Sequence, residues 1–157
     1  MRQDLDEVRH LGSLCECCRR GDVAELRKRL SRAGTQSTRD RVNESVSGFT
    51  PLLYACRGGH LDVCRELIAH GADVNACTKA GASTCLHRAA LSGRADVVDL
   101  LLTHGASPTA RDADGNTALH KASSPAAFDR VHAAHPDLLQ VRNNRGDPPV
   151  RPLLSEA

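Results

Sequence analysis

Three cysteines lie close together near the beginning of the chain, at Cys15, Cys17 and Cys18. Thiolates bind zinc, but the cysteines of a zinc site are usually separated by two to four residues, and a structural site needs four ligands. On a helix, Cys15 and Cys17 would point to different faces. Small thiols also pack as apolar side chains. We therefore expect core positions and no metal ligands, and we keep a zinc or redox function as the weakest alternative.

A second group of potential ligands consists of Asp112, Asp114 and Asn116. Their alternation is typical of the beginning of a calcium-binding loop. Such a loop needs glycine at its sixth position and glutamate at its twelfth, because these residues make the sharp turn and the bidentate contact. Those positions hold Thr117 and Ser123. The pattern thus predicts a turn-rich loop without a metal.

Two histidines, His87 and His120, each follow a threonine by three residues. A histidine can act as a general base, but nucleophilic catalysis requires a nucleophile placed beside it. No serine elbow, glycine-rich phosphate loop or H-E-x-x-H zinc motif occurs in the sequence. We therefore predict a protein that is not an enzyme, has no catalytic residues and needs no cofactor.

The charge balance argues against two classes of partner. The chain has 21 Lys and Arg against 19 Asp and Glu, a formal net charge of +2, which is too balanced for a nucleic-acid or membrane-surface binder. The first residues contain no apolar run, and no stretch approaches the ~20 apolar residues that span a bilayer. An odd number of cysteines, seven, indicates free thiols in a reducing compartment. We expect a cytoplasmic protein, with the nucleus as a second location.

The elements that carry these residues follow from an internal repeat. The segment TPLLYACRGGHLDVCRELIAHGADVNA, residues 50–76, aligns with TCLHRAALSGRADVVDLLLTHGASPTA, residues 84–110. Thr50 and Thr84 are 34 residues apart, and a third copy begins 33 residues later at Thr117 with TALHKAS. A period of this length indicates a stack of small structural units.

Capping residues explain the local structure of one unit. Thr50 is a good N-cap, and Pro51 suits the first helical position because a proline nitrogen has no hydrogen to leave unpaired. We predict a short helix over 51–57, which ends at Gly58 and Gly59. A second helix over 61–70 carries an apolar stripe. One unit cannot bury its two apolar faces alone, so neighbouring units must stack.

The period and the T-P-L-H-x-A core resemble the ankyrin-repeat family, and DADGNTALHKA at 112–122 is a close match to the family's opening motif. The resemblance covers residues 14–150 and implies an all-α solenoid, in which each repeat has two helices and a β-hairpin finger. It gives an N-terminal capping repeat (11–43), repeat 2 (44–76), repeat 3 (77–110), a degenerate repeat 4 (111–143) and a partial C-terminal cap (144–157). It also assigns His87 and His120 to Thr–His hydrogen bonds between adjacent loops. Leu53 replaces this histidine in repeat 2 and should interrupt the network.

The ends of the repeat array are less regular. Residues 33–48 are polar and long for a connection, so we predict a flexible loop there. In repeat 4 the second helix is expected to be short, over 128–134. Residues 141–150 are expected to form a fifth finger followed by an aborted helix, because Pro148 and Pro149 discourage helix formation.

A partner surface can be located by elimination, because residues that repeat belong to the scaffold. The variable positions fall on the finger tips and first helices, which together form the concave face. They are Val46, Ser47, Phe49, Lys79, Ala80, Ser83, Ala113, Asp114 and Asn116 in the fingers, and Tyr54, Arg57, Arg88, Leu91, Lys121 and Ser124 in the helices. Tyr and Arg are frequent interface hot spots, so Phe49, Tyr54 and Arg57 are the expected anchors. The alternative is that Tyr54 packs on a neighbouring helix and Phe49 covers a loop.

The sequence therefore predicts a non-enzymatic, monomeric protein–protein interaction module, an adaptor or scaffold whose partner is another protein. A regulatory inhibitor that occludes an enzyme or transcription factor is the main alternative. Neither nucleic acid nor a membrane is expected as a partner.

Overall fold

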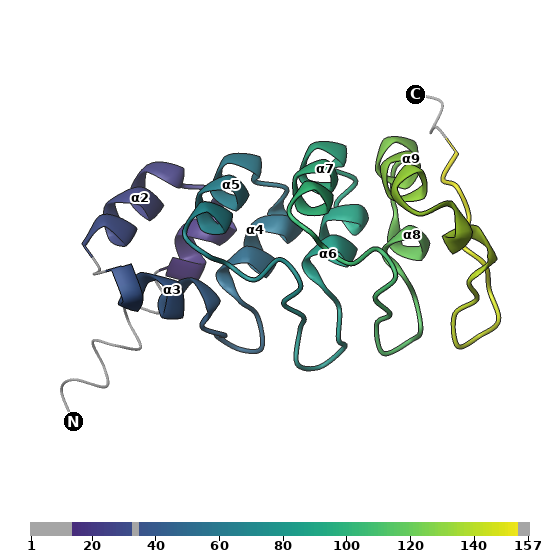
Figure 1. The fold of residues 1–157 in the computed structure, drawn as a ribbon, viewed down its shortest axis with the longest axis horizontal. Helices are drawn as coiled ribbons and strands as arrows, with labels where there is room; N and C mark the ends of the chain where they lie inside the picture. The colour runs from purple at the N-terminus through teal and green to yellow at the C-terminus, as the bar shows by residue number, and fades with distance from the viewer. Residues whose placement is uncertain (1–13, 33–34, 154–157) are drawn as a thin grey trace.

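The computed structural model describes residues 14–32 and 35–153 and is a linear stack of helical units (Figure 1). Residues 14–20 are helical. The elements that follow are α2 (Val23–Ser31), α3 (Thr35–Asn43), α4 (Pro51–Gly58), α5 (Leu61–Ala69), α6 (Cys85–Leu91), α7 (Ala95–Thr103), α8 (Ala118–Lys121), α9 (Pro125–Ala134) and the 3₁₀-helix η1 (Pro136–Gln140). Extended pairing in the described residues consists of two isolated bridges, Val46 with Phe49 and Cys77 with Thr84. The prediction of an all-α solenoid is confirmed.

The helices form two layers, and loops project from one edge of the stack (Figure 1). The first helices α4, α6 and α8 contact one another in series, and the second helices α5, α7 and α9 form the other layer. Each second helix packs on the first helix of its own unit. This arrangement aligns the loops between units side by side, and we refer to them as fingers.

Each well-formed unit begins and ends as its capping residues predict. The Thr50 hydroxyl accepts a hydrogen bond from the Leu53 N–H, and Pro51 is the first residue of α4. Gly59 follows α4 with a φ of 70°, a left-handed conformation that a side chain would strain. An added Cβ at Gly59 would also lie 2.6 Å from the Arg94 side chain of the next unit. Glycine here therefore permits both the turn and close stacking.

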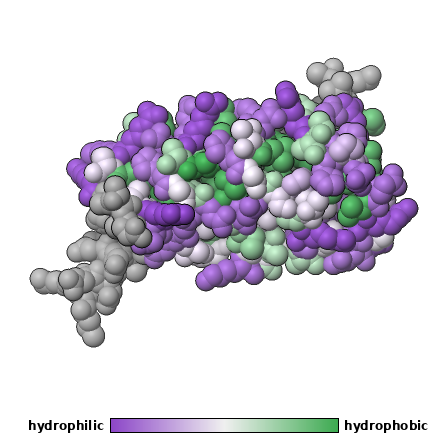
Figure 2. Space-filling view, viewed as in Figure 1, coloured by the Kyte–Doolittle hydropathy of each residue, from purple (hydrophilic) through white to green (hydrophobic). Residues whose placement is uncertain are grey.

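The core runs through the whole stack and is built from leucine, valine, alanine and cysteine. Leu52, Leu67, Leu86, Leu101 and Leu119 are at most 1% exposed. Truncating one such leucine to alanine would cost about 2–5 kcal/mol. The side of the stack drawn in Figure 2 is mixed, with apolar side chains gathered over α5 and α7 between polar ones. The units thus share one continuous interior.

The polar segment between repeats 1 and 2 departs from expectation. We predicted a flexible loop over 33–48, but residues 35–43 form α3; residues 33–34 lie outside the described part. Val42 is fully buried, and the Asn43 side chain donates to Gly71 O at 2.9 Å and accepts from the Asp73 N–H at 2.7 Å. The loop prediction is wrong there because contacts with repeat 2, rather than the segment's own apolar pattern, stabilise the helix.

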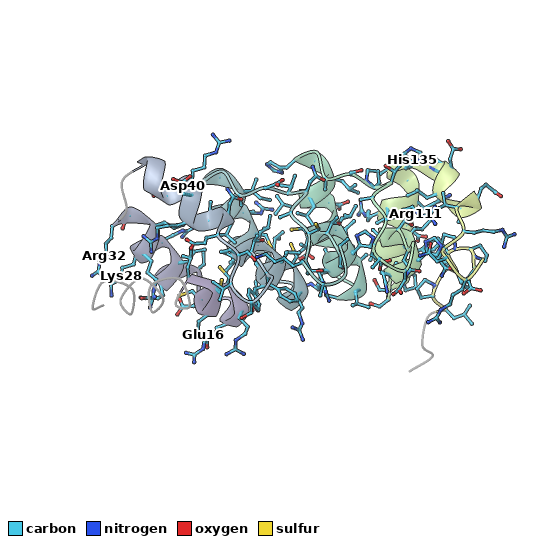
Figure 3. All side chains as sticks on the ribbon, turned by 90° about the horizontal axis from the view of Figure 1, so that it is seen from below. Glu16, Lys28, Arg32, Asp40, Arg111 and His135 are labelled. Carbon is cyan, nitrogen blue, oxygen red and sulfur yellow. The ribbon has the colours of Figure 1, made fainter. Side chains whose placement is uncertain are left out.

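The two ends of the array cap it differently. At the N-terminal end, residues 14–20 and α2 form the predicted helix–Gly–helix unit, and Lys28 and Arg32 point away from the stack (Figure 3). In repeat 4 the first helix has only four residues, whereas α9 begins at Pro125 rather than at residue 128. The expected start and the expected short length were wrong, because α9 has ten residues and begins at Pro125, a residue suited to the first helical position. The Ser124 hydroxyl caps the helix by accepting from the Ala127 N–H. A fifth finger is present over 143–147.

Candidate partner-binding groove

The second finger, residues 46–49, is a four-residue hairpin. Val46 and Phe49 exchange both of their backbone hydrogen bonds, at 2.9 and 3.0 Å. The two central residues, Ser47 and Gly48, have φ angles of 53° and 82°. Two positive φ angles in this position are typical of a type I′ turn. The hairpin ends at Phe49, and the next residue, Thr50, is the N-cap of α4.

The third finger, residues 78–83, is longer. The Thr78 N–H donates to Ser83 O at 3.0 Å, so this hairpin spans six residues, whereas the fourth finger, residues 112–116, is closed by Asp112 N–H to Asn116 O across five. The additional length accounts for the period of 34 rather than 33. Ala82 adopts a φ of 49° within the longer loop.

Two of the three predicted anchors, Phe49 and Tyr54, meet a third candidate residue, Arg88, beside the second finger. The rings of Phe49 and Tyr54 lie with their centroids 5.2 Å apart, and Arg88 Cζ lies 5.3 Å from the centroid of Phe49. An Arg over an aromatic ring is attracted by the negative face of the ring. Arg88 Nε is buried and makes no hydrogen bond. The second finger, α4 and α6 therefore contribute one side chain each to a single stacked cluster.

A groove opens beside this cluster. Its cavity measures about 490 Å³, and we call it the finger groove; its walls are Ser47, Gly48, Phe49, Thr78, Lys79, Ala80, Gly81 and Arg88. A neighbouring hollow of about 420 Å³ is bordered by Arg19, Tyr54, Arg57 and Gly58. Tyr54, which lines this hollow, contacts Phe49, which lines the finger groove.

The charged side chains of the two depressions are all cationic. Arg57 and Lys79 are exposed and Arg88 is half-buried, and none of the three forms an ion pair within residues 14–32 and 35–153. Arg19 is paired with Glu16 at 2.6 Å. The region therefore presents positive charge that the scaffold itself leaves uncompensated.

The remaining sequence candidates lie apart from the groove or serve the scaffold. Leu91 is 51% exposed at the end of α6, and Ala113 and Asp114 are exposed at the fourth finger tip. Lys121 pairs with Asp112 at 3.4 Å. Among the others, Val46 closes the second finger, Ser83 closes the third, and Ser124 caps α9.

Asn116 requires a correction. Its side chain is only 9% exposed, donates to Asp112 Oδ2 at 3.4 Å and accepts from Asn143 Nδ2 at 3.0 Å. Its backbone N–H donates to Asp112 Oδ1. Asn116 therefore holds the fourth finger together and is not available to a partner. Repeat alignment could not reveal this, because the hydrogen-bond partners come from the same loop and the next finger.

Sequence reasoning also missed Arg19, which borders the hollow from the first unit. A signal was present: aligning Gly21 with Gly59 places Arg19 at the position of Arg57. The glycines and Thr78 that line the finger groove could not be singled out, because their role depends on how two fingers face each other.

The histidines join the fingers, as the resemblance implied. Backbone N–H and hydroxyl of Thr84 both lie within hydrogen-bond distance of His87 Nδ1, at 3.2 and 2.8 Å, which leaves Nε2–H to donate to Asn116 O at 2.8 Å. His120 repeats this arrangement with Thr117 and with Asp147 O. Burial lowers the pKa of both histidines, which favours the neutral form that these hydrogen bonds need.

The cysteine cluster packs as a core element. Cys15, Cys17 and Cys18 are at most 6% exposed. Burial raises the pKa of Cys15 to about 11 and that of Cys18 further. The thiolate is the form that binds metals and attacks disulfides, and these thiols are protonated at neutral pH. Figure 3 shows the sulfur atoms inside the stack, and the described residues contain no group of three or more side chains that could hold a metal ion.

Comparison with known proteins identifies the fold family. A family model described as "Ankyrin repeats (3 copies)" matches residues 14–112 and 78–132. The chain belongs to the ankyrin-repeat family. Ankyrin repeats are modules that bind other proteins, and their fold is typically non-enzymatic.

Similar segments occur in much larger proteins. The chain is 38% identical over 121 residues to the E3 ubiquitin-protein ligase hecd-1 of Caenorhabditis elegans, covering 74% of this chain and 4% of the relative. It is 39% identical over 85 residues to the 2-5A-dependent ribonuclease of Mus musculus, covering 54% and 11%. It is 36% identical over 115 residues to BCL-6 corepressor-like protein 1 of Homo sapiens, covering 73% and 6%. The chain thus spans a small fraction of each relative. Among the helices of the described residues, none has the length and apolar character needed to cross a membrane.

Proposed function

We propose that this chain is a non-enzymatic adaptor that binds a partner protein through its concave face, with the finger groove and the adjoining hollow as the centre of the contact. The observation that carries the proposal is the cluster of Phe49, Tyr54 and Arg88, which lies beside uncompensated positive charge. Aromatic and Arg side chains at the centre of an interface supply most of its binding energy.

The relatives give independent support. The names of three of them describe a ubiquitin ligase, a ribonuclease and a corepressor, which are unrelated activities. A segment that recurs in proteins with such different activities is more consistent with recognition than with catalysis. The same recognition role is proposed for this chain.

The concave face would serve either of two biological roles. An adaptor leaves the partner active and brings it to another protein, whereas an inhibitor of an enzyme or transcription factor would block its working surface. Within residues 14–32 and 35–153 no contact favours the inhibitor, so the adaptor is preferred. A monomeric protein of the cytoplasm or nucleus is consistent with seven free cysteines.

Affinity purification with the double variant Tyr54→Ala/Arg57→Ala tests the proposal. We expect recovered partners to fall by about 10-fold or more, since each hot-spot truncation costs roughly 1–2 kcal/mol. The matched control is Asp62→Ala/Arg65→Ala, which removes two exposed side chains from the outer helix α5. Arg57→Ala alone repeats the test at an exposed position with little risk to the core. Undiminished partner recovery by a double variant with normal helical content would refute the proposal.

A further inference from the structure

Resting on the proposed function, we infer that the finger groove binds an extended acidic peptide segment of the partner, whose Asp or Glu carboxylate pairs with Arg88 while an adjacent apolar side chain packs on Phe49. The inference deepens the proposed function by naming the chemistry of the ligand. It depends on three observations: which residues line the groove, the unpaired Nε of Arg88, and the replacement of the histidine tether by Leu53.

The guanidinium of Arg88 has a hydrogen-bond donor available for an anion. Its Cζ lies 5.3 Å from the centroid of the Phe49 ring, and its buried Nε makes no hydrogen bond. A buried donor without a partner costs about 1–3 kcal/mol, and a ligand that satisfies it recovers that cost. Arg binds a carboxylate side-on through two parallel N–H donors, and a rotation of the guanidinium over the ring would present Nε to the groove.

The walls of the groove favour a carboxylate over a phosphate. Gly48, Ala80 and Gly81 bring the backbone close and offer no charge, and Lys79 is the second cation. The two cations, half-buried Arg88 and exposed Lys79, match the charge of either anion, so the choice rests on desolvation. A phosphate dianion would have to lose more hydration than a carboxylate against the same largely uncharged walls.

The size and shape of the groove fit a short peptide. A cavity of about 490 Å³ lies within the ~300–1,000 Å³ typical of ligand sites, which suits a few side chains and not a folded surface. The groove lies between two fingers that are joined by a single backbone hydrogen bond, Lys79 N–H to Gly48 O at 3.3 Å. An extended chain placed between the fingers would reach Arg88 and Phe49 together.

This junction has the backbone bond between Lys79 and Gly48 but lacks the histidine tether of the next junction. In repeat 3 the His87 side chain reaches across to Asn116 O and draws the fourth finger against α6. In repeat 2 the same position holds Leu53, which is fully buried and cannot make such a bond. Arg88, the residue after His87, therefore faces a junction that no side chain of α4 closes by hydrogen bonding.

The test selects random displayed 12-residue peptides against the full chain and measures the affinity of a selected peptide by fluorescence polarisation. We expect the selected sequences to share an Asp or Glu next to an apolar residue. Changing that acid to its amide, or Arg88→Gln, should weaken binding about 10-fold or more, as expected for a bidentate ion pair. Lys79→Gln should weaken it about 3-fold, because an exposed cation contributes less. Arg65→Gln on α5 is the matched control and should leave the affinity unchanged.

Further readouts keep the test independent of folding defects. Arg88→Lys keeps the charge but removes the planar pair of donors. We expect its affinity for the peptide to lie between that of the wild type and that of Arg88→Gln. In NMR spectra the peptide should shift the amide signals of Gly48, Lys79 and Gly81. The inference is overturned if the selected peptides contain no Asp or Glu, or if they bind equally well when that acid is replaced by Asn or Gln. It is also overturned if they bind only in a phosphorylated form, or if they shift backbone amide signals other than those of Gly48, Lys79 and Gly81. Peptides that depend on Tyr54 and Arg57 but not on Arg88 would overturn it and leave the proposed function standing.

Discussion

The junction between the third and fourth fingers and the junction between the second and third are built from equivalent positions but are joined differently. At the former, His87 Nε2–H donates to Asn116 O at 2.8 Å, and the Ala113 N–H donates to Gly81 O at 2.9 Å. At the latter, Leu53 replaces the histidine, and a single backbone bond of 3.3 Å connects Lys79 to Gly48.

The difference shows how one repeat scaffold supplies both rigidity and a binding site. Where the histidine is present, the polar groups of the neighbouring fingers satisfy one another and leave little for a ligand. Where it is absent, the fingers border a groove and Arg88 Nε remains unpaired. A polar group that the scaffold does not use is available for recognition, whereas one already hydrogen-bonded would have to exchange partners.

The largest expected effect comes from making the tethered junction resemble the open one. His87→Leu removes the bonds to Thr84 and Asn116 and leaves buried backbone groups unpaired, so we expect the free energy of unfolding to fall by about 2–3 kcal/mol. Urea unfolding measures the loss, and amide exchange should accelerate most at Ala113.

A matched histidine provides the control for this variant. His104 donates from Nδ1 to Leu100 O at an exposed helix end, so His104→Leu should cost less than about 1 kcal/mol. If His87→Leu and His104→Leu lowered the free energy of unfolding equally, the stabilising role of the His87 tether would be contradicted.

Acidification should weaken the tethered junction selectively. Burial lowers the pKa of His87 and His120 in the folded state, so the unfolded chain binds protons more readily. Their contribution is complete above the unfolded pKa of about 6.5 and declines below it, with a slope of at most about 1.4 kcal/mol per pH unit for buried His87 and a smaller one for the more exposed His120.

Urea unfolding at about pH 7.5 and about pH 5.5 measures this dependence. His87→Leu should be less sensitive to the change than the wild type, since one of the two histidines with a lowered pKa is gone. Amide exchange at the second–third junction, which has no histidine tether, should change less than at the third–fourth. An identical pH response of both chains would contradict the assignment.

The smallest expected effect concerns the open junction. Ser47 has a φ of 53° at the first central position of its turn, where asparagine is the preferred residue with glycine following. Ser47→Asn should therefore raise the free energy of unfolding by about 0.5 kcal/mol. Thermal unfolding measures the gain. Ser45→Asn, one residue before the hairpin, is the control, and a gain of equal size there would indicate that the turn is not responsible.

Much of the repeat architecture could be predicted from single residues. Thr50, Pro51 and Gly59 determine the limits of α4 by local capping and backbone geometry, and all three lie at the ends of the helix itself. The helix α3 could not be predicted, because Val42 and Asn43 gain their partners from repeat 2. Within the site, Phe49, Tyr54, Arg57 and Arg88 were all among the candidates predicted from the sequence, whereas Asn116 was assigned to the wrong role.

The sequence by itself determined the period, the limits of the main helices and the positions left variable by the scaffold, since these depend on local capping and apolar spacing. It also indicated, through Leu53, where the histidine network would be interrupted. Only the tertiary structure decided that this interruption coincides with a groove, and that Arg88 lies there over Phe49 with an unpaired Nε. The physical reason is that a groove and an unsatisfied donor are properties of how two neighbouring units face each other, and neither unit contains that information alone.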